Sequence, residues 1–244
     1  MKKALQCGLA VIFAASFCFL FFILLDHDFE WGRIRAYRSN LISGWLMTIL
    51  VSSCALVLSI LLGAVLTAGQ LSSLRGTRWL ARSWVELIRG TPLLTQILIG
   101  YYLVANRLGI DDRFWIGVVL LATFAAAYLS EIFRAGIESI PKSQLESARA
   151  VGFTSGQMYR YIVVPQAMRR VLPATAGQFA NLIKDSSLLF VISVQELTMQ
   201  SRETNAATYA TFESYIPMAL GYLVLTLPIS FWTRHLEERF RYET

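Results

Sequence analysis

The chain has 244 residues, of which 55% are hydrophobic and only 16% are charged. An average soluble domain carries roughly 25% charged residues, so this composition excludes an ordinary soluble domain and indicates a protein of the lipid bilayer. The formal net charge of +6 needs no nucleic acid to explain it, because Lys and Arg gather in the cytoplasmic loops of membrane proteins.

Long uncharged runs predict the membrane-spanning helices. A helix needs about 20 mainly apolar residues to cross the hydrocarbon core, and five runs come near or exceed this length: residues 4–25, 39–74, 90–106, 114–130 and 214–233. A sixth, residues 171–195, contains Lys184 and Asp185, so it spans only if these charges face protein or water. We expect an all-α integral membrane protein of about six transmembrane helices.

The first run permits two interpretations. Lys2 and Lys3 ahead of an apolar run also fit a secretory signal peptide, but no clear small-x-small cleavage site precedes Asp26. We therefore favour a retained helix, with residues 1–38 forming an extra N-terminal span and outer segment before a transmembrane domain of residues 39–244. Placing most Lys and Arg inside puts both termini in the cytoplasm.

The longest polar interval, residues 134–170, is expected on the cytoplasmic side and resembles a pair of short helices. Ser143 and Glu146 have the spacing of a capping box. Gly152 suits the position after a helix where φ is positive. This pattern predicts a helix from about Ser143 to the turn at Gly152.

The second short helix has its own start and stop signals. Thr154 and Gln157 have the spacing of another capping box, and Pro165 is expected to stop or kink the helix near Val164. Ala148 and Ala150 would let another surface approach closely. A compact helix pair of this kind is typical of a docking element, but a solvated loop helix would have the same signals.

The spacing from Glu146 to Pro165 resembles the cytoplasmic loop of ABC importer permeases. That loop has the pattern Glu-Ala-Ala, three residues, Gly, nine residues and Ile-x-Leu-Pro, and this chain has Glu146-Ser147-Ala148, then Gly152, then Ile162-Val163-Val164-Pro165. Five further segments resemble the polar amino-acid uptake subfamily: residues 86–93, 128–134, 136–142, 165–167 and 184–188. The departures are mainly small-for-small, such as Ser147 for Ala, while Arg149 adds a charge.

The resemblance implies a division of labour among several chains. The residues expected to contact the ATPase are Glu146, Ser147, Ala148, Arg149 and Gly152. The chain has no G-x-x-x-x-G-K-[ST] loop and no metal-ligand spacing, so we expect no cofactor in it, with ATP and Mg²⁺ bound by partner ATPase subunits. The other implied partners are a second permease chain, a soluble or lipid-tethered amino-acid-binding protein and membrane lipid. The implied location is the bacterial cytoplasmic (inner) membrane.

Four polar residues inside the sixth run are candidates for the substrate path: Lys184, Asp185, Ser186 and Ser187. A charge at the bilayer centre costs at least about 2.5 kcal/mol on insertion scales, so both charges need partners or water. They either form a local ion-pair network or meet the carboxylate and ammonium groups of a zwitterionic substrate. The sequence leaves both possibilities open.

A second set of polar residues lies at the cytoplasmic ends of the spans, and these are candidates for a gate or an interface: Glu86, Arg89, Thr91, Glu131 and Arg134. Spacings of three predict the pairs Glu86–Arg89 and Glu131–Arg134 across one helical turn. Pro92 disfavours helical geometry at Thr91, so a break is expected there, with Thr91 either capping the next helix or forming part of a gate.

Two other functions compete with that of an ABC permease. A secondary transporter would be expected to have two matching broken helices in an inverted repeat, and no such pair is visible. A membrane assembly protein without transport activity would not need intramembrane charges or a capped cytoplasmic helix pair. Cys7, Cys18 and Cys54 all fall in apolar runs, where free thiols are the simplest interpretation.

Overall fold

The computed structural model describes residues 15, 16, 19 and 27–240. Within these residues all regular structure is helical, as the composition predicted. Most of the first apolar run, with Cys7 and Cys18 and the question of the signal peptide, lies outside the described residues.

The helices follow one another with short connections. The N-terminal half contains α2 (Trp31–Ile34), the 3-10 helix η1 (Arg35–Tyr37), α3 (Arg38–Gln70), α4 (Arg75–Arg89), α5 (Leu93–Ile99), the π-helix η2 (Gly100–Ala105), the 3-10 helix η3 (Asn106–Leu108) and α6 (Arg113–Glu138). The C-terminal half contains α7 (Lys142–Ala150), α8 (Ser155–Met158), the π-helix η4 (Tyr159–Val163), α9 (Val164–Asp185), the 3-10 helix η5 (Ser186–Ile192), α10 (Leu197–Thr208) and α11 (Thr211–Phe240).

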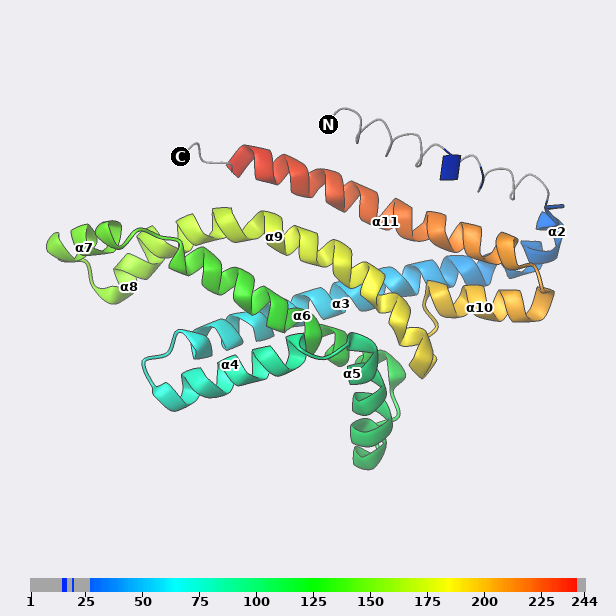
Figure 1. Ribbon diagram of the computed structural model, residues 1–244, viewed down its shortest axis with the longest axis horizontal. Helices are drawn as coiled ribbons and strands as arrows, with labels where there is room; N and C mark the ends of the chain where they lie inside the picture. The colour runs from blue at the N-terminus through cyan, green and yellow to red at the C-terminus, as the bar shows by residue number, and fades with distance from the viewer. Residues whose placement is uncertain (1–14, 17–18, 20–26, 241–244) are drawn as a thin grey trace.

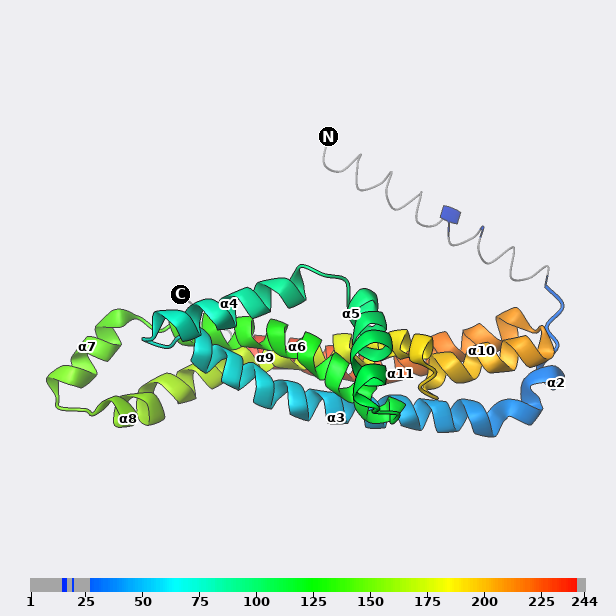
Figure 2. The same ribbon diagram turned by 90° about the horizontal axis from the view of Figure 1, so that it is seen from below.

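Four long helices, α3, α6, α9 and α11, run along the long axis of an elongated molecule (Figure 1). The helices α7 and α8 lie at one end, α2 and α10 lie at the other, and α5 projects across the bundle (Figure 2). The polar helix pair α7 and α8 therefore lies at a free end of the molecule, where another protein can reach it.

Small residues let the long helices approach closely. A Cβ added at Gly63 of α3 would lie 3.1 Å from Cβ of Leu129 on α6. Ala55 of α3 and Ala122 of α6 are fully buried together in one core cluster. Close contact through small side chains is typical of helices packed in membranes, where burial from water cannot drive association between spans.

The described helices include three that are long and apolar enough to cross a membrane: Trp31–Gln70, Arg113–Glu138 and Thr211–Phe240. The pair Arg75–Arg89 and Leu93–Leu108 adds a fourth span if the two helices are counted together across their 104° bend. The bend occurs at Gly90–Pro92, because Pro92 has an extended ψ of 137° and stops α4. The predicted break at Thr91 is therefore confirmed.

Pro165 does not stop its helix, so the first of the two predicted outcomes, a stop or a kink, was wrong. The helical path continues from α8 through η4 into α9, and Pro165 lies in the first turn of α9. Proline has no N–H to donate, and its fixed φ suits the first turn of a helix. The π-helical turn η4 just before it shifts the hydrogen-bond partners by one residue. The helix therefore passes Pro165 without a break.

Candidate functional site

The start of α7 differs from the predicted capping box. The N-cap is Pro141, with no side-chain cap, and the backbone N–H of Gln144 donates to the carbonyl oxygen of Pro141 over 3.1 Å. Helix α7 therefore begins at Lys142, so Ser143 lies inside its first turn and Glu146 does not reach back to cap it. The predicted Ser143–Glu146 cap was wrong because Pro141, with its fixed φ, already supplies the extended residue before the helix.

The end of α7 follows the prediction closely. Gly152 has φ of +86°, its N–H donates to the carbonyl oxygen of Arg149, and the N–H of Phe153 donates to that of Ala148, both over 3.0 Å. These two bonds form a Schellman motif, which satisfies the last carbonyls of a helix. The Thr154–Gln157 capping box is also confirmed at the start of α8.

The helices α7 and α8 together form a projecting element, which we call the knob (residues 142–158). The structure exposes Glu146, Ser147, Arg149 and Gly152 on it, whereas Ala148 is buried. Ala148 thus packs inside the knob and lines a groove of about 470 Å³ with Phe153 and Ile162. Four of the five predicted ATPase-contact residues are therefore available to a partner.

An apolar tip on the knob was missed by the sequence reasoning. Val151 is 73% exposed and Phe153 is 38% exposed, on either side of the positive-φ turn at Gly152. Neighbouring apolar side chains exposed on one turn are candidates for a protein–protein contact. The hydrophobic residues flanking the predicted turn were the available signal.

The predicted path residues Lys184 and Asp185 lie at the end of α9. The helix changes to the 3-10 helix η5 directly after Asp185. Lys184 is exposed and Asp185 half-buried, and neither forms an ion pair within 4 Å with any residue in the described part of the chain. Among the described residues, a local ion-pair network at Lys184 and Asp185 is therefore not observed.

The two serines after Asp185 differ from each other. Ser186 is fully buried and its hydroxyl donates to the carbonyl oxygen of Ile183 over 2.7 Å, so its hydrogen-bonding capacity is used inside the bundle. Ser187 is half-buried. Of the four predicted path residues, Lys184, Asp185 and Ser187 thus keep accessible side-chain surface.

Lys184 opens onto a polar groove between α9 and α11. The groove has a volume of about 500 Å³ and includes Gln178 and Asn181 from α9 and Arg234 and Glu237 from α11. The two helices are close here, since a Cβ on Gly177 would lie 4.0 Å from Cγ2 of Thr233. The groove was not predicted, because its two walls are some fifty residues apart in the sequence.

The candidate gate residues come together with one changed pairing. Arg134 forms ion pairs with Glu131 over 2.8 Å and with Glu138 over 2.9 Å, which confirms the predicted Glu131–Arg134 pair. Arg89 pairs with Glu131 on α6 over 3.3 Å rather than with Glu86. The predicted Glu86–Arg89 pair was wrong because a carboxylate from another helix lies nearer.

These charges surround a small polar cavity, which we call the α4–α6 cavity. It has a volume of about 220 Å³ and is lined by Gln70, Arg82, Val85, Glu86, Arg89, Glu131 and Arg134. Thr91 lies outside it. Its hydroxyl donates to the carbonyl oxygen of Leu87 over 3.0 Å, so Thr91 caps the end of α4 rather than the start of α5. Four of the five gate candidates therefore form one cluster.

Two buried acids, Glu196 and Glu213, were missed altogether. Glu196 is fully buried and caps α10, accepting hydrogen bonds from the backbone N–H groups of Thr198 and Met199, each over 2.8 Å. The hydroxyl of Tyr222 on α11 also donates to it over 2.7 Å. Glu196 thus links α10 to α11 through its hydrogen bonds to the start of α10 and to Tyr222. The Glu-Leu-Thr sequence after an apolar run was a weak capping signal.

The sequence profile of one protein family, described as the binding-protein-dependent transport system inner membrane component, matches residues 55–242. This chain belongs to that family. Members are membrane components of ABC importers that work with substrate-binding proteins and with ATPases on separate subunits.

Individual relatives match the chain over most of its length. The probable glutamine ABC transporter permease protein GlnM of Bacillus subtilis is 37% identical over 201 residues, covering 82% of this chain and 93% of the relative. The arginine transport system permease protein ArtQ of the same organism is 34% identical over 202 residues, covering 82% and 92%. A crystal structure of an amino acid ABC transporter with histidines matches with a TM-score of 0.80 and 34% identity, covering 87% of this chain and all of that one.

Proposed function

We propose that this chain is the transmembrane subunit of an ATP-binding cassette importer that moves a polar amino acid across the bacterial cytoplasmic membrane. One observation carries the proposal: the exposed, Schellman-capped knob at a free end of a bundle of membrane-length helices, in a chain whose relatives are named as glutamine and arginine permeases. The chain itself makes and breaks no bond. ATP and Mg²⁺ would be bound by partner ATPase subunits.

The knob would transmit force from the ATPase to the membrane helices. It is joined to α9 by the continuous path α8–η4–α9, so displacement of the knob would move α9 as a lever. Glu146, Ser147, Arg149 and the backbone at Gly152 would contact the ATPase, together with the apolar tip at Val151.

The unpaired charges at the end of α9 support a second permease chain and a substrate path. A charge in hydrocarbon without a partner is costly, and Lys184 and Asp185 have no ion-pair partner in the described residues. Two copies of this chain, or this chain and a related one, would cover the α9–α11 groove and enclose water there. The Lys184 ammonium would then meet the carboxylate of the substrate, and Asp185 its ammonium group.

The proposed topology places the knob and both termini in the cytoplasm and residues 1–38 as an additional N-terminal unit. A soluble or lipid-tethered binding protein would deliver substrate at the opposite end, near α10. The amide side chains of Gln178 and Asn181 in the groove suit a polar side chain, in line with a polar amino acid as cargo.

Uptake normalised to the amount of inserted protein tests the path. Asp185→Asn keeps the shape but loses a charge-assisted hydrogen bond worth about 1.5 to 3 kcal/mol, so normalised uptake should fall about tenfold or more. Lys184→Met should affect acidic substrates most. Asp111→Asn, the same change on an exposed loop, serves as the control. Unchanged normalised uptake in both path variants would remove Lys184 and Asp185 from the path.

A further inference from the structure

An apolar stripe runs along one face of α11, which lies at the edge of the bundle (Figure 1). Its side chains follow spacings of three, four and seven residues, which place them on one side of a helix. They are between 41% and 63% exposed and comprise Leu220, Leu223, Val224, Leu227 and Phe231. The described helices therefore leave this stripe open.

The N-terminal apolar run joins the described chain at the start of this stripe. Glu213 lies seven residues before Leu220, on the same face of α11, and it is buried. The residues that follow the run contact it: the N–H of Glu30 donates to Glu213 Oε1 over 2.6 Å, and His27 Nε2 lies 3.5 Å from the same oxygen. The His27 ring also packs against Phe212, with a centroid distance of 4.6 Å. The first turn of the face is thus already covered by the end of the N-terminal segment.

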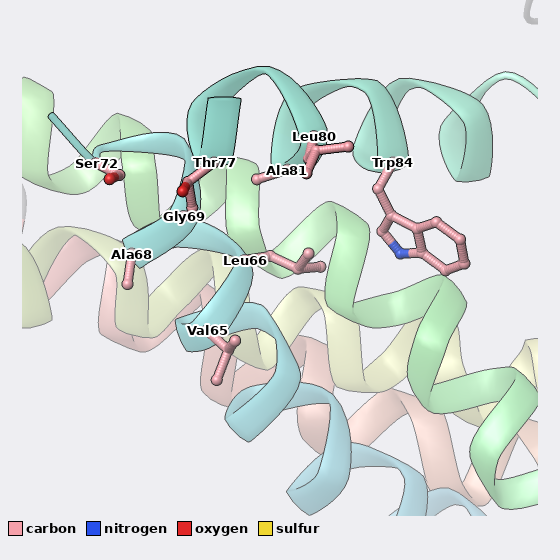
Figure 3. Close-up of a pocket in the computed structure, with 9 residues that line it drawn as sticks. All are labelled: Val65, Leu66, Ala68, Gly69, Ser72, Thr77, Leu80, Ala81 and Trp84. Carbon is pink, nitrogen blue, oxygen red and sulfur yellow. The ribbon is translucent and has the colours of Figure 1, made fainter. Parts of the chain in front are cut away.

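The length of the run matches the stripe. Residues 4–25 would extend about 33 Å as a helix, and the rise from Glu213 to Phe231 along α11 is about 27 Å. Another apolar surface is the α3–α4 groove, lined by Val65 and Leu80 (Figure 3). Val65 lies about 40 Å along α3 from the end of the bundle where the run begins, so the run is too short to cover that groove.

An antiparallel pairing of the run with α11 has a fixed register. In the proposed topology the run crosses the membrane outward and α11 crosses it inward, so the two helices are antiparallel. Because His27 lies beside Glu213, each step back along the run is matched by one step forward along α11. Leu9 is therefore placed opposite Phe231.

The same register matches opposite charges at the cytoplasmic end. Glu238 lies seven residues after Phe231, on the same face, and is exposed. It forms no ion pair within 4 Å with a residue in the described part of the chain, and the register puts Lys2 opposite it. We propose that the N-terminal run packs as an antiparallel helix on the α11 stripe, with the Lys2 ammonium beside the Glu238 carboxylate.

The pairing covers two surfaces that are open in the structure. The described residues of the run, Ala15, Ser16 and Phe19, are exposed, as is the stripe. Ser230 and Thr233, which line the α9–α11 groove, lie on another face of α11. The N-terminal helix therefore leaves that groove free for the second permease chain.

Oxidative cross-linking of the full chain in membranes tests the pairing. In a chain whose three native cysteines are replaced by Ser, Leu9→Cys with Phe231→Cys should form an intrachain disulfide, identified by mass spectrometry of non-reduced peptides. Leu9→Cys with Trp232→Cys is the matched control, because Trp232 is similarly exposed but points about 100° away around the helix. We expect a yield about fivefold higher at Phe231, since a disulfide tolerates only a narrow range of Cα separations.

A second pair shows that the oxidation works. His27→Cys with Phe212→Cys joins two positions whose rings lie 4.6 Å apart and should form a disulfide in every preparation. If it forms and the Leu9–Phe231 pair does not, lipid rather than the run covers the stripe and the proposal is wrong. Equal yields at Phe231 and Trp232 would also contradict it.

Two further results would overturn the pairing. A disulfide-linked dimer on a non-reducing gel, in place of the intrachain bond, would mean that the run packs on a second copy. Loss of the run by intact mass would remove the helix itself. The pairing rests on the proposed topology and on retention of the run, and it is measured without transport, so its failure would leave the proposed amino-acid import untouched.

Discussion

Arg89 Nη1 lies 3.3 Å from Glu131 Oε2, which joins the last turn of α4 to α6 immediately before the 104° bend into α5. Glu131 also holds Arg134 over 2.8 Å, so one carboxylate serves two guanidinium groups on two helices. The orientation of α4, and of the bend that follows it, therefore depends on Glu131.

This arrangement predicts unequal effects of two identical substitutions. Glu131→Gln should lower the thermal stability of the purified chain, because each partly exposed ion pair that it breaks contributes up to about 1 kcal/mol. Glu86→Gln should have little effect, since the side chain of Glu86 lines the same cavity without a partner among the described residues. Thermal unfolding of both variants in detergent checks this, and equal loss of stability would refute the assignment.

The geometry of the turn after α7 predicts that substituting Gly152 weakens ATPase binding, whereas substituting Gly156 does not. Gly152→Val should strain the knob by about 1 kcal/mol or more, because φ there is +86° and the left-handed region disfavours side chains. Gly156→Ala should be harmless, since a Cβ there meets open space. Recovery of the ATPase with the affinity-purified chain should fall for Gly152→Val alone; similar recovery for all three proteins would count against the knob as the ATPase contact.

Glu146 offers a test that separates contact from folding. Because Glu146 does not cap α7, Glu146→Ala should leave the hydrogen-exchange protection of α7 unchanged while reducing ATPase recovery. Ser143→Ala, which also removes no cap, is the control and should change neither quantity. If Glu146→Ala loosened α7 itself, the loss of the ATPase would have to be attributed to unfolding of the knob.

The topology is testable with introduced cysteines. Ser39→Cys, at the exposed start of α3, should react with an impermeant thiol reagent added outside the cell. Ser155→Cys, on the knob, should be protected until the membrane is opened. Reaction of Ser155→Cys in intact cells would reverse the proposed orientation, and intact-mass analysis of the same preparation determines whether the N-terminal run is retained.

Local signals were predicted from the sequence more reliably than contacts between distant segments. Gly152 and the Thr154–Gln157 cap depend only on residues within one turn, and both were confirmed. The cap at Ser143 was wrong for an equally local reason, because Pro141 competes for the start of the same helix. The break at Pro92 follows from the steric restriction that proline places on its neighbour.

Three further errors and omissions involve partners from other helices. Glu131 replaces Glu86 as the partner of Arg89 because helix packing brings it closer, and no spacing rule along the chain contains that information. The α9–α11 groove and the Glu196–Tyr222 bond likewise depend on which faces of two helices meet. The sequence shows that these residues are polar and costly to place in a membrane. Which residues they contact can be identified only from the packing of the helices.

The central claim is that transport by this chain is driven by ATP hydrolysis on partner subunits. The most direct measurement is amino-acid uptake into proteoliposomes that contain the chain, its co-purifying ATPase and any second permease chain, with ATP inside and the binding protein outside. We expect accumulation of a polar amino acid that requires both ATP and the binding protein and that is lost in Gly152→Val. If the chain alone, without the ATPase, accumulated the amino acid in response to an ion gradient, that result would contradict the account.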